Sequence, residues 1–484
     1  MKKIKYLFAF LLVISMSSCE KWLSVKPKAQ IDSEDNFKTE QGFKDALTGV
    51  YLNLSSTQLY GMDMTWGFVD VLAKQYTEYS SSQNNTYSRL MDWNYTTPEG
   101  VEKIRSIWKG MYYSIANLNN IIDNIDKSGS GIFSGTNYNV IKGECLGLRA
   151  FHHFDLLRLF APSPSAAGGL TAPGIPYREH LDNYSAEKFT IAQDLEKIVL
   201  DLKSAATLLE TADPIKNTQI SSTDYLRDRK FKFNYYAVQS LLARVYLYAG
   251  DYEKALEHSK IVINDSEAGK FPVTPIAQVI NGNRIFSTEV IFYINMTNLN
   301  TLVNENFVPS ANTNVAMSKS NALMRNVFDV QNNAANSSDY RYQYWTIANS
   351  STSAKGTITK LYQELNTNLD AVNRLPLVRL SEMYYIAAES CLKIAGKRLE
   401  ADTYLNKARA NRGLAPLSTN LSTVQFQDEI FKEYRKEFLA EGQLFYYYKR
   451  LNLPNIITTT NFPAGPAVYN LPFPDDEIEY GNVK

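Results

Sequence analysis

Seven stretches of this 484-residue chain place apolar residues three and four positions apart. This spacing gathers the apolar side chains on one face of an α-helix, and that face must pack against another element. The pattern therefore predicts an all-α dominated fold. The seven stretches are Gln41–Ser55, Glu99–Asp126, Asn139–Phe160, Glu187–Glu210, Asn234–Asp265, Leu380–Arg412 and Phe426–Leu451.

Part of this pattern is typical of a tetratricopeptide helix pair. Within Val238–Ile263, Ala243 and Ala255 are small enough to let two helices approach closely, and Gly250 turns the chain between them. The stretch Tyr384–Leu414 repeats the arrangement with a longer turn. We therefore expect antiparallel helix pairs stacked into a superhelical scaffold.

Four long stretches lack this periodicity and are rich in Asn, Ser, Thr, Gly and Pro. Long irregular segments in a compact protein usually carry function. We expect them to gather into a loop-rich lobe that contains minor β structure and carries a binding surface. The alternative is that they only connect helices. The stretches are Ser80–Pro98, Ala161–Tyr184, Glu267–Ser318 and Gln331–Asn373.

The N-terminus has the form of a lipoprotein export signal. Three lysines among the first five residues precede the apolar run Tyr6–Met16, and two serines stand directly before Cys19. The run is too short to span a bilayer, so we expect residues 1–18 to be a cleaved signal peptide. Cys19 would then carry the lipid, and residues 19–30 would form a flexible tether. An ordinary secretory signal followed by an incidental cysteine is the alternative.

Composition limits the classes of partner. The chain has 50 Lys and Arg and 50 Asp and Glu, so its formal net charge is zero. This balance argues against a nucleic-acid surface and favours a neutral ligand. Besides Cys19, the chain has only Cys145 and Cys391, each within an apolar helical pattern, and we expect both to be buried small hydrophobic residues.

We find no sequence signature of an enzyme, a cofactor or a metal site. The four histidines are not spaced as metal ligands, and no nucleotide-binding or nucleophile motif is present. Glu433, Glu437 and Glu441 line one helix face at intervals of four. They could be interpreted as the carboxylates of a glycosidase, but the surrounding lysines and arginines favour structural ion pairs.

Several blocks of the sequence, taken in order, resemble the SusD/RagB family of surface lipoproteins. The most specific is Arg374–Glu389 (RLPLVRLSEMYYIAAE), which is similar to the family's signature helix. Small departures occur at Ser24, where the family often has aspartate, and at Gly143–Gly147. The other matching blocks are Trp22–Pro27, Trp108–Asn124, Glu144–Phe160, Asn406–Gly413, Glu433–Leu451 and Leu471–Gly481.

The resemblance implies both a fold and a function. Members have an α-helical scaffold of tetratricopeptide-like pairs that supports a looped face. They are anchored by lipid to the cell surface at the outer membrane, where they capture oligosaccharides, or peptides in the RagB branch, for a TonB-dependent barrel of the SusC type. We therefore expect one SusD-like domain at 31–484, with halves at about 31–265 and 267–484 and the binding lobe mainly at 80–98 and 267–373.

The resemblance also places the ligand site on an early loop and a mid-chain loop of this lobe. The candidate segments here are Tyr87–Tyr95 and Asp339–Trp345, since both mix aromatic rings with planar polar groups. A sugar needs rings to stack on and polar groups for its hydroxyls. We expect Trp93 and Trp345 to stack, with further contacts from Tyr87, Arg89, Asn94, Tyr95, Arg341, Tyr342 and Tyr344.

A structural interpretation competes with this one in the later segment. Residues 340–344 alternate as a β-strand whose rings would lie against the scaffold. The family commonly uses an Asp-x-Arg pattern near here for structure, which weakens Asp339 and Arg341 as ligand contacts.

Overall fold

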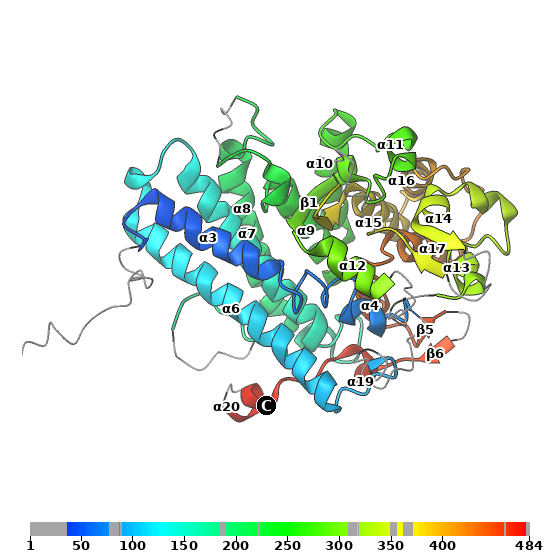
Figure 1. Cartoon of the computed structure of the whole chain (residues 1–484), viewed down its shortest axis with the longest axis horizontal. Coiled ribbons are helices and arrows are strands. Elements are labelled where there is room, and N and C mark those ends of the chain that lie inside the picture. Colours follow the sequence, from blue (N-terminus) through cyan, green and yellow to red (C-terminus); the bar gives the residue numbers. More distant parts are fainter. Residues whose placement is uncertain are drawn as a thin grey trace, which may run out of the picture.

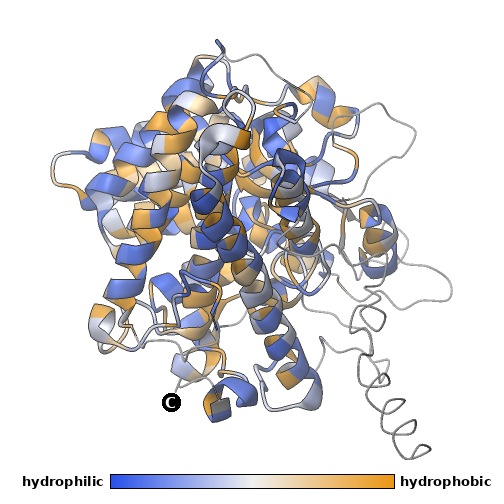
Figure 2. Ribbon diagram, turned by 90° about the vertical axis from the view of Figure 1, so that its left-hand side faces the viewer, coloured by the Kyte–Doolittle hydropathy of each residue, from blue (hydrophilic) through white to orange (hydrophobic). Residues whose placement is uncertain are grey.

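The computed structural model describes residues 36–76, 87, 90–182, 189–219, 223, 225–307, 317, 319–348, 356–361, 371–458 and 461–480. Helices dominate these residues, as the periodicity predicts (Figure 1). In Figure 2 hydrophilic and hydrophobic residues alternate along the helices, as amphipathic packing requires. Within the described residues, no helix combines the length and apolarity needed to cross a membrane. The predicted signal peptide, Cys19 and the tether lie outside the described residues.

The N-terminal half is built around α7, which is buried along almost its whole length between α6 and α8. Helix α6 begins after the capping residue Thr97 with Pro98 in its first turn, and a capping box of Thr190 and Gln193 opens α8. The helices are α3 (Glu40–Leu54), α4 (Phe68–Leu72), α6 (Pro98–Ser128), α7 (Asn137–Phe160), α8 (Ile191–Ala212), α9 (Tyr235–Ala249) and α10 (Tyr252–Glu267), with 3₁₀ turns at Ser130–Ile132, Gly169–Thr171 and Arg229–Phe231.

The tetratricopeptide-like pairing is confirmed. Gly250 ends α9 in the left-handed conformation (φ 82°), and the side chain of Asp251 then caps α10. Ala243 and Ala255 are fully buried where the two helices meet. Helix α10 also packs against α15, so the second pair, α15 and α16, stacks on the first.

The C-terminal half mixes helices with short strands. Its helices are α11 (Ile276–Ile280), α12 (Leu299–Phe307), α13 (Asn321–Val327), α14 (Tyr340–Trp345), α15 (Leu380–Lys393), α16 (Arg398–Ala410), α17 (Thr423–Glu437), α18 (Leu444–Arg450), α19 (Pro466–Tyr469) and α20 (Asp475–Tyr480), with 3₁₀ turns at Ser287–Glu289 and Ala334–Ser338. Its strands are β1 (Val290–Asn295), β2 (Thr346–Ala348), β3 (Gly356–Ile358), β4 (Arg374–Arg379), β5 (Asn455–Ile457) and β6 (Asn461–Pro463).

The strands form three antiparallel pairs, which confirms the predicted minor β structure. Strand β1 pairs with β4 in a register that places Tyr293 opposite Pro376 and Ile294 opposite Leu375. The other two pairs are β2 with β3 and β5 with β6. Because β4 leads directly into α15, the signature block begins as a buried strand and only then becomes a helix.

The predicted helical stretch Phe426–Leu451 is divided into α17 and α18. Ala440 and Gly442 between them have positive φ angles of 61° and 72°. The backbone N–H of Gly442 donates a hydrogen bond to Asp70 Oδ1 at 3.0 Å, and a Cβ at this position would lie 2.5 Å from the carbonyl oxygen of Met64. A contact with α4 therefore breaks the helix, and only glycine fits there.

The end of the chain packs back onto the first long helices, so both halves share one core. The backbone N–H of Leu471 and the ammonium of Lys449 each donate to the carbonyl oxygen of Leu159, both at 3.1 Å. The ring of Phe473 meets that of Trp108 edge-on at a centroid distance of 5.4 Å. Segments more than 280 residues apart in sequence are thereby joined.

Candidate functional site

The early aromatic segment is anchored by two buried tyrosines. The hydroxyl of Tyr87 donates to Asp63 Oδ1 at 2.7 Å, and that of Tyr95 donates to the carbonyl oxygen of Val468 at 2.6 Å. Their side chains are only 5% and 6% exposed. Packing and hydrogen bonds occupy these rings, so their contact with a ligand stays a prediction that has no open ring face to support it. They hold the segment on the scaffold instead.

Between the two anchors, Trp93 is half-buried and held in one orientation. Its indole N–H donates to the carbonyl oxygen of Leu72 at 3.0 Å, and its ring meets Phe462 at a centroid distance of 6.2 Å. Its φ of 55° lies in the left-handed region, which costs a non-glycine residue about 1–3 kcal/mol. The segment thus presents part of an indole ring that is fixed before any ligand arrives.

The ammonium of Lys74 supports this ring. It lies 4.3 Å from the centroid of Trp93 and 4.7 Å from that of Phe462, and it also donates to the carbonyl oxygen of Met91. Burial lowers the pKa of Lys74, while the carboxylate of Asp92, 3.6 Å away, opposes this shift. A cation between two rings stabilises their arrangement by about 0.5–2 kcal/mol.

Two exposed polar residues stand next to Trp93 in the sequence. The side chain of Asp92 is 90% exposed. Asn94 is also exposed, and its Oδ1 accepts a hydrogen bond from Thr96 Oγ1 at 2.8 Å, which fixes its amide group. Together, the ring, the carboxylate and the amide combine a surface for stacking with hydrogen-bonding groups at its edge. We name Lys74, Asp92, Trp93, Asn94 and Phe462 the Trp93 platform.

Sequence reasoning predicted Trp93 and Asn94 but missed Lys74 and Phe462 as parts of the platform. Phe462 lies 369 residues after Trp93 in the sequence and reaches it only because β6 brings its ring beside Trp93 and Lys74. No local sequence signal could have found this contact. Arg89, the remaining predicted residue of the early segment, lies outside the described residues.

The later segment differs sharply from the early one. It forms the short helix α14, so the alternating strand considered for residues 340–344 is wrong. Trp345 is fully buried and packs against Phe286 at a centroid distance of 5.2 Å. Its indole N–H donates to the carbonyl oxygen of Arg284, and the ammonium of Lys360 lies 4.2 Å from its ring. These neighbours cover the ring, so stacking of a ligand on Trp345 stays a prediction that has no open face to support it.

Arg341 is also fully buried and cannot meet a ligand in this structure. Its guanidinium donates to Asp339 at 2.7 and 2.9 Å, to Glu433 at 2.6 Å and to Glu437 at 2.9 Å. These contacts support the structural interpretation of the Asp-x-Arg pattern, and hydroxyl binding by Arg341 stays a prediction that its burial does not support. The carboxylates compensate the cost of burying the cation.

The other two predicted tyrosines of this segment are half-buried. Tyr342 packs beside Phe328 at a centroid distance of 5.5 Å, and Tyr344 packs against the small cluster around Trp345. Neither ring is brought next to Trp93 by a contact among the described residues. Both remain predictions, with weaker support than Trp93.

Glu437 lies at the centre of the buried charges of α17. It accepts hydrogen bonds from Arg341, Arg379, Arg412 and Ser381 at 2.7 to 3.2 Å. Although burial alone would raise its pKa, the adjacent guanidinium groups, Arg412 first, hold the pKa of Glu437 well below its usual range. A carboxylate fixed in its ionised form cannot act as the general acid of a glycosidase.

The other two carboxylates of this helix face are paired in the same way. Glu433 accepts from Arg341, Arg409 and Lys436, and Glu441 pairs with Arg379 and Lys360. These ion pairs confirm the structural interpretation of the three glutamates. Cys145 and Cys391 are buried free thiols, as expected. Among the described residues, no group of His, Cys, Asp and Glu side chains is arranged to hold a metal ion.

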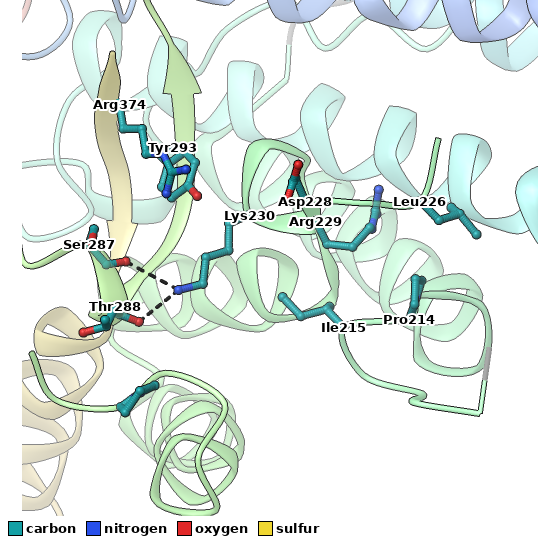
Figure 3. Close-up of a pocket in the computed structure, with 11 residues that line it drawn as sticks. Pro214, Ile215, Leu226, Asp228, Arg229, Lys230, Ser287, Thr288, Tyr293 and Arg374 are labelled. Carbon is teal, nitrogen blue, oxygen red and sulfur yellow. Dashed lines mark hydrogen bonds between the residues drawn. The ribbon is translucent and has the colours of Figure 1, made fainter. Parts of the chain in front are cut away.

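A separate hollow of about 560 Å³ lies where the two halves of the chain meet (Figure 3). Lys230 donates from one wall to the carbonyl oxygens of Ser287 and Thr288 at 3.4 and 3.0 Å on the other. Tyr293 is only 3% exposed, and the guanidinium of Arg374 lies 4.9 Å from its ring centroid. This hollow therefore offers no open ring for stacking and is a poorer sugar site than the Trp93 platform.

Comparisons with known proteins give the family. Residues 21–247 match the family model described as starch-binding associating with outer membrane, and residues 279–481 match the model of the SusD family. The chain belongs to the SusD family. Its curated relatives include SusD-like protein P2 and SusD-like protein P38 of Formosa agariphila, each 24% identical. The first alignment covers 99% of this chain and 97% of the relative, and the second covers 93% and 92%.

Solved SusD structures share the fold. A SusD superfamily protein of Bacteroides thetaiotaomicron has a TM-score of 0.68 at 23% identity, covering 92% of this chain and 98% of that chain. Surface glycan-binding protein A of the same species, solved in complex with laminarihexaose, has a TM-score of 0.68 at 17% identity and covers 92% and 99%. The SusD-like helical scaffold is thus shown along nearly the whole chain.

Proposed function

We propose that this SusD-like protein binds a neutral glycan at the cell surface and delivers it to a SusC-like TonB-dependent barrel in the outer membrane. In this proposal lipid at Cys19 anchors the chain, and the protein itself performs no chemistry. The Trp93 platform carries the proposal, because it combines a fixed, partly open indole ring with an exposed carboxylate and amide. The neighbour solved with laminarihexaose supports the glycan as ligand class.

Weak binding suits this role. One stacked ring contributes about 1 kcal/mol, and a few hydrogen bonds add similar amounts, so affinities between micromolar and millimolar are expected. A tethered receptor tolerates such affinities, because repeated units of a polymer rebind locally. Weak binding also permits release to the transporter.

Isothermal titration calorimetry of the purified protein against a panel of neutral oligosaccharides and a mixture of short peptides tests the ligand class. We expect heat from at least one oligosaccharide and none from the peptides. Binding of peptides alone would replace the glycan with the RagB-like alternative. Release of reducing ends from polysaccharide by the protein would contradict the absence of catalysis.

A Cys19→Ala variant tests the anchor. We expect it to bind oligosaccharide in solution as the unmodified sequence does, while cells that carry it lose surface-bound protein and glycan uptake. The measurements are titration of the purified variant and growth of the cells on the glycan. Loss of binding in solution would show that the cysteine has another role.

A further inference from the structure

A second groove, of about 480 Å³, lies between α13, α17 and the end of β5. One wall comes from the end of α13 and the turn after it, and the other from the exposed face of α17. Its lining residues used below are Asn326, Asp329, Asn332, Gln425, Asp428, Glu429, Phe431, Lys432, Arg435 and Ile457. Neither candidate segment of the sequence analysis contributes to it.

Arg435 lines this groove and is only 7% exposed, yet it has no carboxylate partner among the described residues. Its single hydrogen bond there runs from Nη1 to Asn326 Oδ1 at 3.2 Å. Burial lowers the pKa of Arg435. Arg341 and Arg409, buried near the same helix, each donate to Glu433. A guanidinium carries five N–H donors, so Arg435 offers hydrogen bonds that the described protein atoms do not accept.

Acceptors line the rim of the groove above α17. Asp428 is exposed and makes no hydrogen bond to a described residue. Lys432 lies 2.7 Å from Glu429 and 3.5 Å from Asp329, so two rim carboxylates are partly neutralised. The amide of Asn332 donates to Asp329 Oδ1 at 2.7 Å, which fixes this carboxylate.

An aromatic ring completes the lining. Phe431 is half-buried, and its ring is supported by Tyr447 and Tyr448 at centroid distances of 5.7 and 5.6 Å. The exposed side chain of Gln425 stands on the same helix six residues earlier, and its Oε1 accepts from the backbone N–H of Ser422 at 2.9 Å. The groove thus combines donors, acceptors and a supported ring, which is the lining that a polyhydroxylated ring requires.

The charges select a neutral ligand. Three carboxylates, of Asp329, Asp428 and Glu429, face two cations, Lys432 and Arg435, so an anionic ligand would be repelled at the rim. A sugar hydroxyl avoids this cost, because its oxygen accepts from Arg435 while its proton is donated to a carboxylate. We infer that this groove is a second carbohydrate-binding subsite, which takes the part of a neutral oligosaccharide that extends beyond the Trp93 platform.

The inference rests on the proposed function, and it gives the glycan a second place of contact on the protein. The two sites lie on either side of one hairpin: Ile457 of β5 lines the groove and pairs with Asn461, whose neighbour Phe462 belongs to the Trp93 platform. Successive side chains of a strand point to opposite faces, so Ile457 and Phe462 face opposite sides of this strand pair. A disaccharide therefore reaches only one site, whereas an oligosaccharide of several units that passes over the edge of the strand pair contacts both.

The test compares short and long probes on variants that keep the fold. Asp428→Ala removes an exposed carboxylate, and Gln425→Ala removes an exposed amide that also closes the capping box of α17, so the stability of each variant is measured by denaturation beside its affinity. Glu257→Ala on α10 is the matched control, since it removes an exposed glutamate far along the chain from the groove. Titration calorimetry with maltose, maltoheptaose, laminaribiose and laminarihexaose measures affinity for each variant, alone and combined with Trp93→Ala.

We expect Gln425→Ala and Asp428→Ala together to weaken binding of the longer probe about five-fold and to leave the affinity for the disaccharide unchanged. Combined with Trp93→Ala, they should abolish the binding that Trp93→Ala alone retains. Arg435→Lys, which keeps the charge but loses donors, should act in the same direction. If the pair behaves as Glu257→Ala does while the unchanged protein binds a probe, the second subsite is overturned and the proposed function stands. If no probe binds the unchanged protein, both fall.

Discussion

Trp93 and Trp345 stand in segments that both contain Tyr, Arg and Asp, yet the structure uses them in opposite ways. Trp93 stays half-buried, with its indole N–H bonded to the carbonyl oxygen of Leu72 and its ring beside the ammonium of Lys74. Trp345 is closed off by Phe286 and Lys360. The segment around Trp345 is fixed from inside by Arg341 and its carboxylates, whereas the one around Trp93 is fixed from its ends. Whether the rings of an aromatic-rich segment face solvent or the core therefore depends on where the segment is anchored.

Removal of Arg341, the internal anchor of the later segment, should have the largest effect on stability. Arg341→Ala leaves buried Asp339 without its cation and takes one of several cations from Glu433 and Glu437, which should lower the free energy of unfolding by about 3–5 kcal/mol. Chemical denaturation measures this. Arg325→Ala, which removes an exposed arginine of α13, is the matched control and should change stability by less than about 0.5 kcal/mol. Equal effects of the two variants would contradict the anchoring role of Arg341.

Truncation of the buried Trp345 ring should have the next largest effect on stability. Trp345→Ala creates a cavity beside Phe286 and should cost about 3 kcal/mol of stability, while Trp345→Phe should cost less because it keeps part of the packing. Glycan affinity of the folded fraction should not change. A selective loss of affinity, with stability retained, would return Trp345 to the binding site.

The two segments also differ in the protonation of the carboxyl groups that lie beneath them. Glu437, below the later segment, is ionised by its arginines, whereas burial raises the pKa of Asp70, in the helix that supports Trp93, to about 8. Between about pH 4 and pH 8 the folded state then holds a proton that the unfolded state has lost, so this group reduces stability as pH rises.

Asp70→Asn should remove this dependence. Relative to the variant, the unchanged protein should lose up to about 1.4 kcal/mol of stability per pH unit in that window. Denaturation midpoints at pH 5, 6, 7 and 8 provide the measurement. Parallel pH profiles for the two proteins would show that Asp70 is ionised in the folded state.

The smallest effect in free energy concerns the open ring. Trp93→Ala should weaken glycan binding by about 1 kcal/mol, or roughly five-fold, and Trp93→Tyr should retain part of the affinity. Its stability should change less than that of Trp345→Ala, since the ring is only half-buried. Titration and denaturation of the same samples make the comparison. Unaltered affinity in Trp93→Ala would remove the platform from the binding site.

The helices and their pairing were predictable because their signals are local. The 3.6-residue period and Gly250 are sufficient to place α9 and α10. The break between α17 and α18 was not predictable, because it depends on Asp70, 372 residues before Gly442. The burial of Trp345 likewise depends on Phe286. Composition shows that a segment contains aromatic rings, but contacts with residues distant in the sequence determine which rings face solvent.

The return of the chain's end to its first long helices also bears on how the protein is made. Leu159 receives its partners Lys449 and Leu471 only after 290 and 312 further residues have been synthesised, and Phe473 reaches Trp108 only after 365. The N-terminal helices therefore cannot complete their core while the chain is emerging from the ribosome. For the exported lipoprotein that we propose, this order postpones the final packing step until the end of the chain is available.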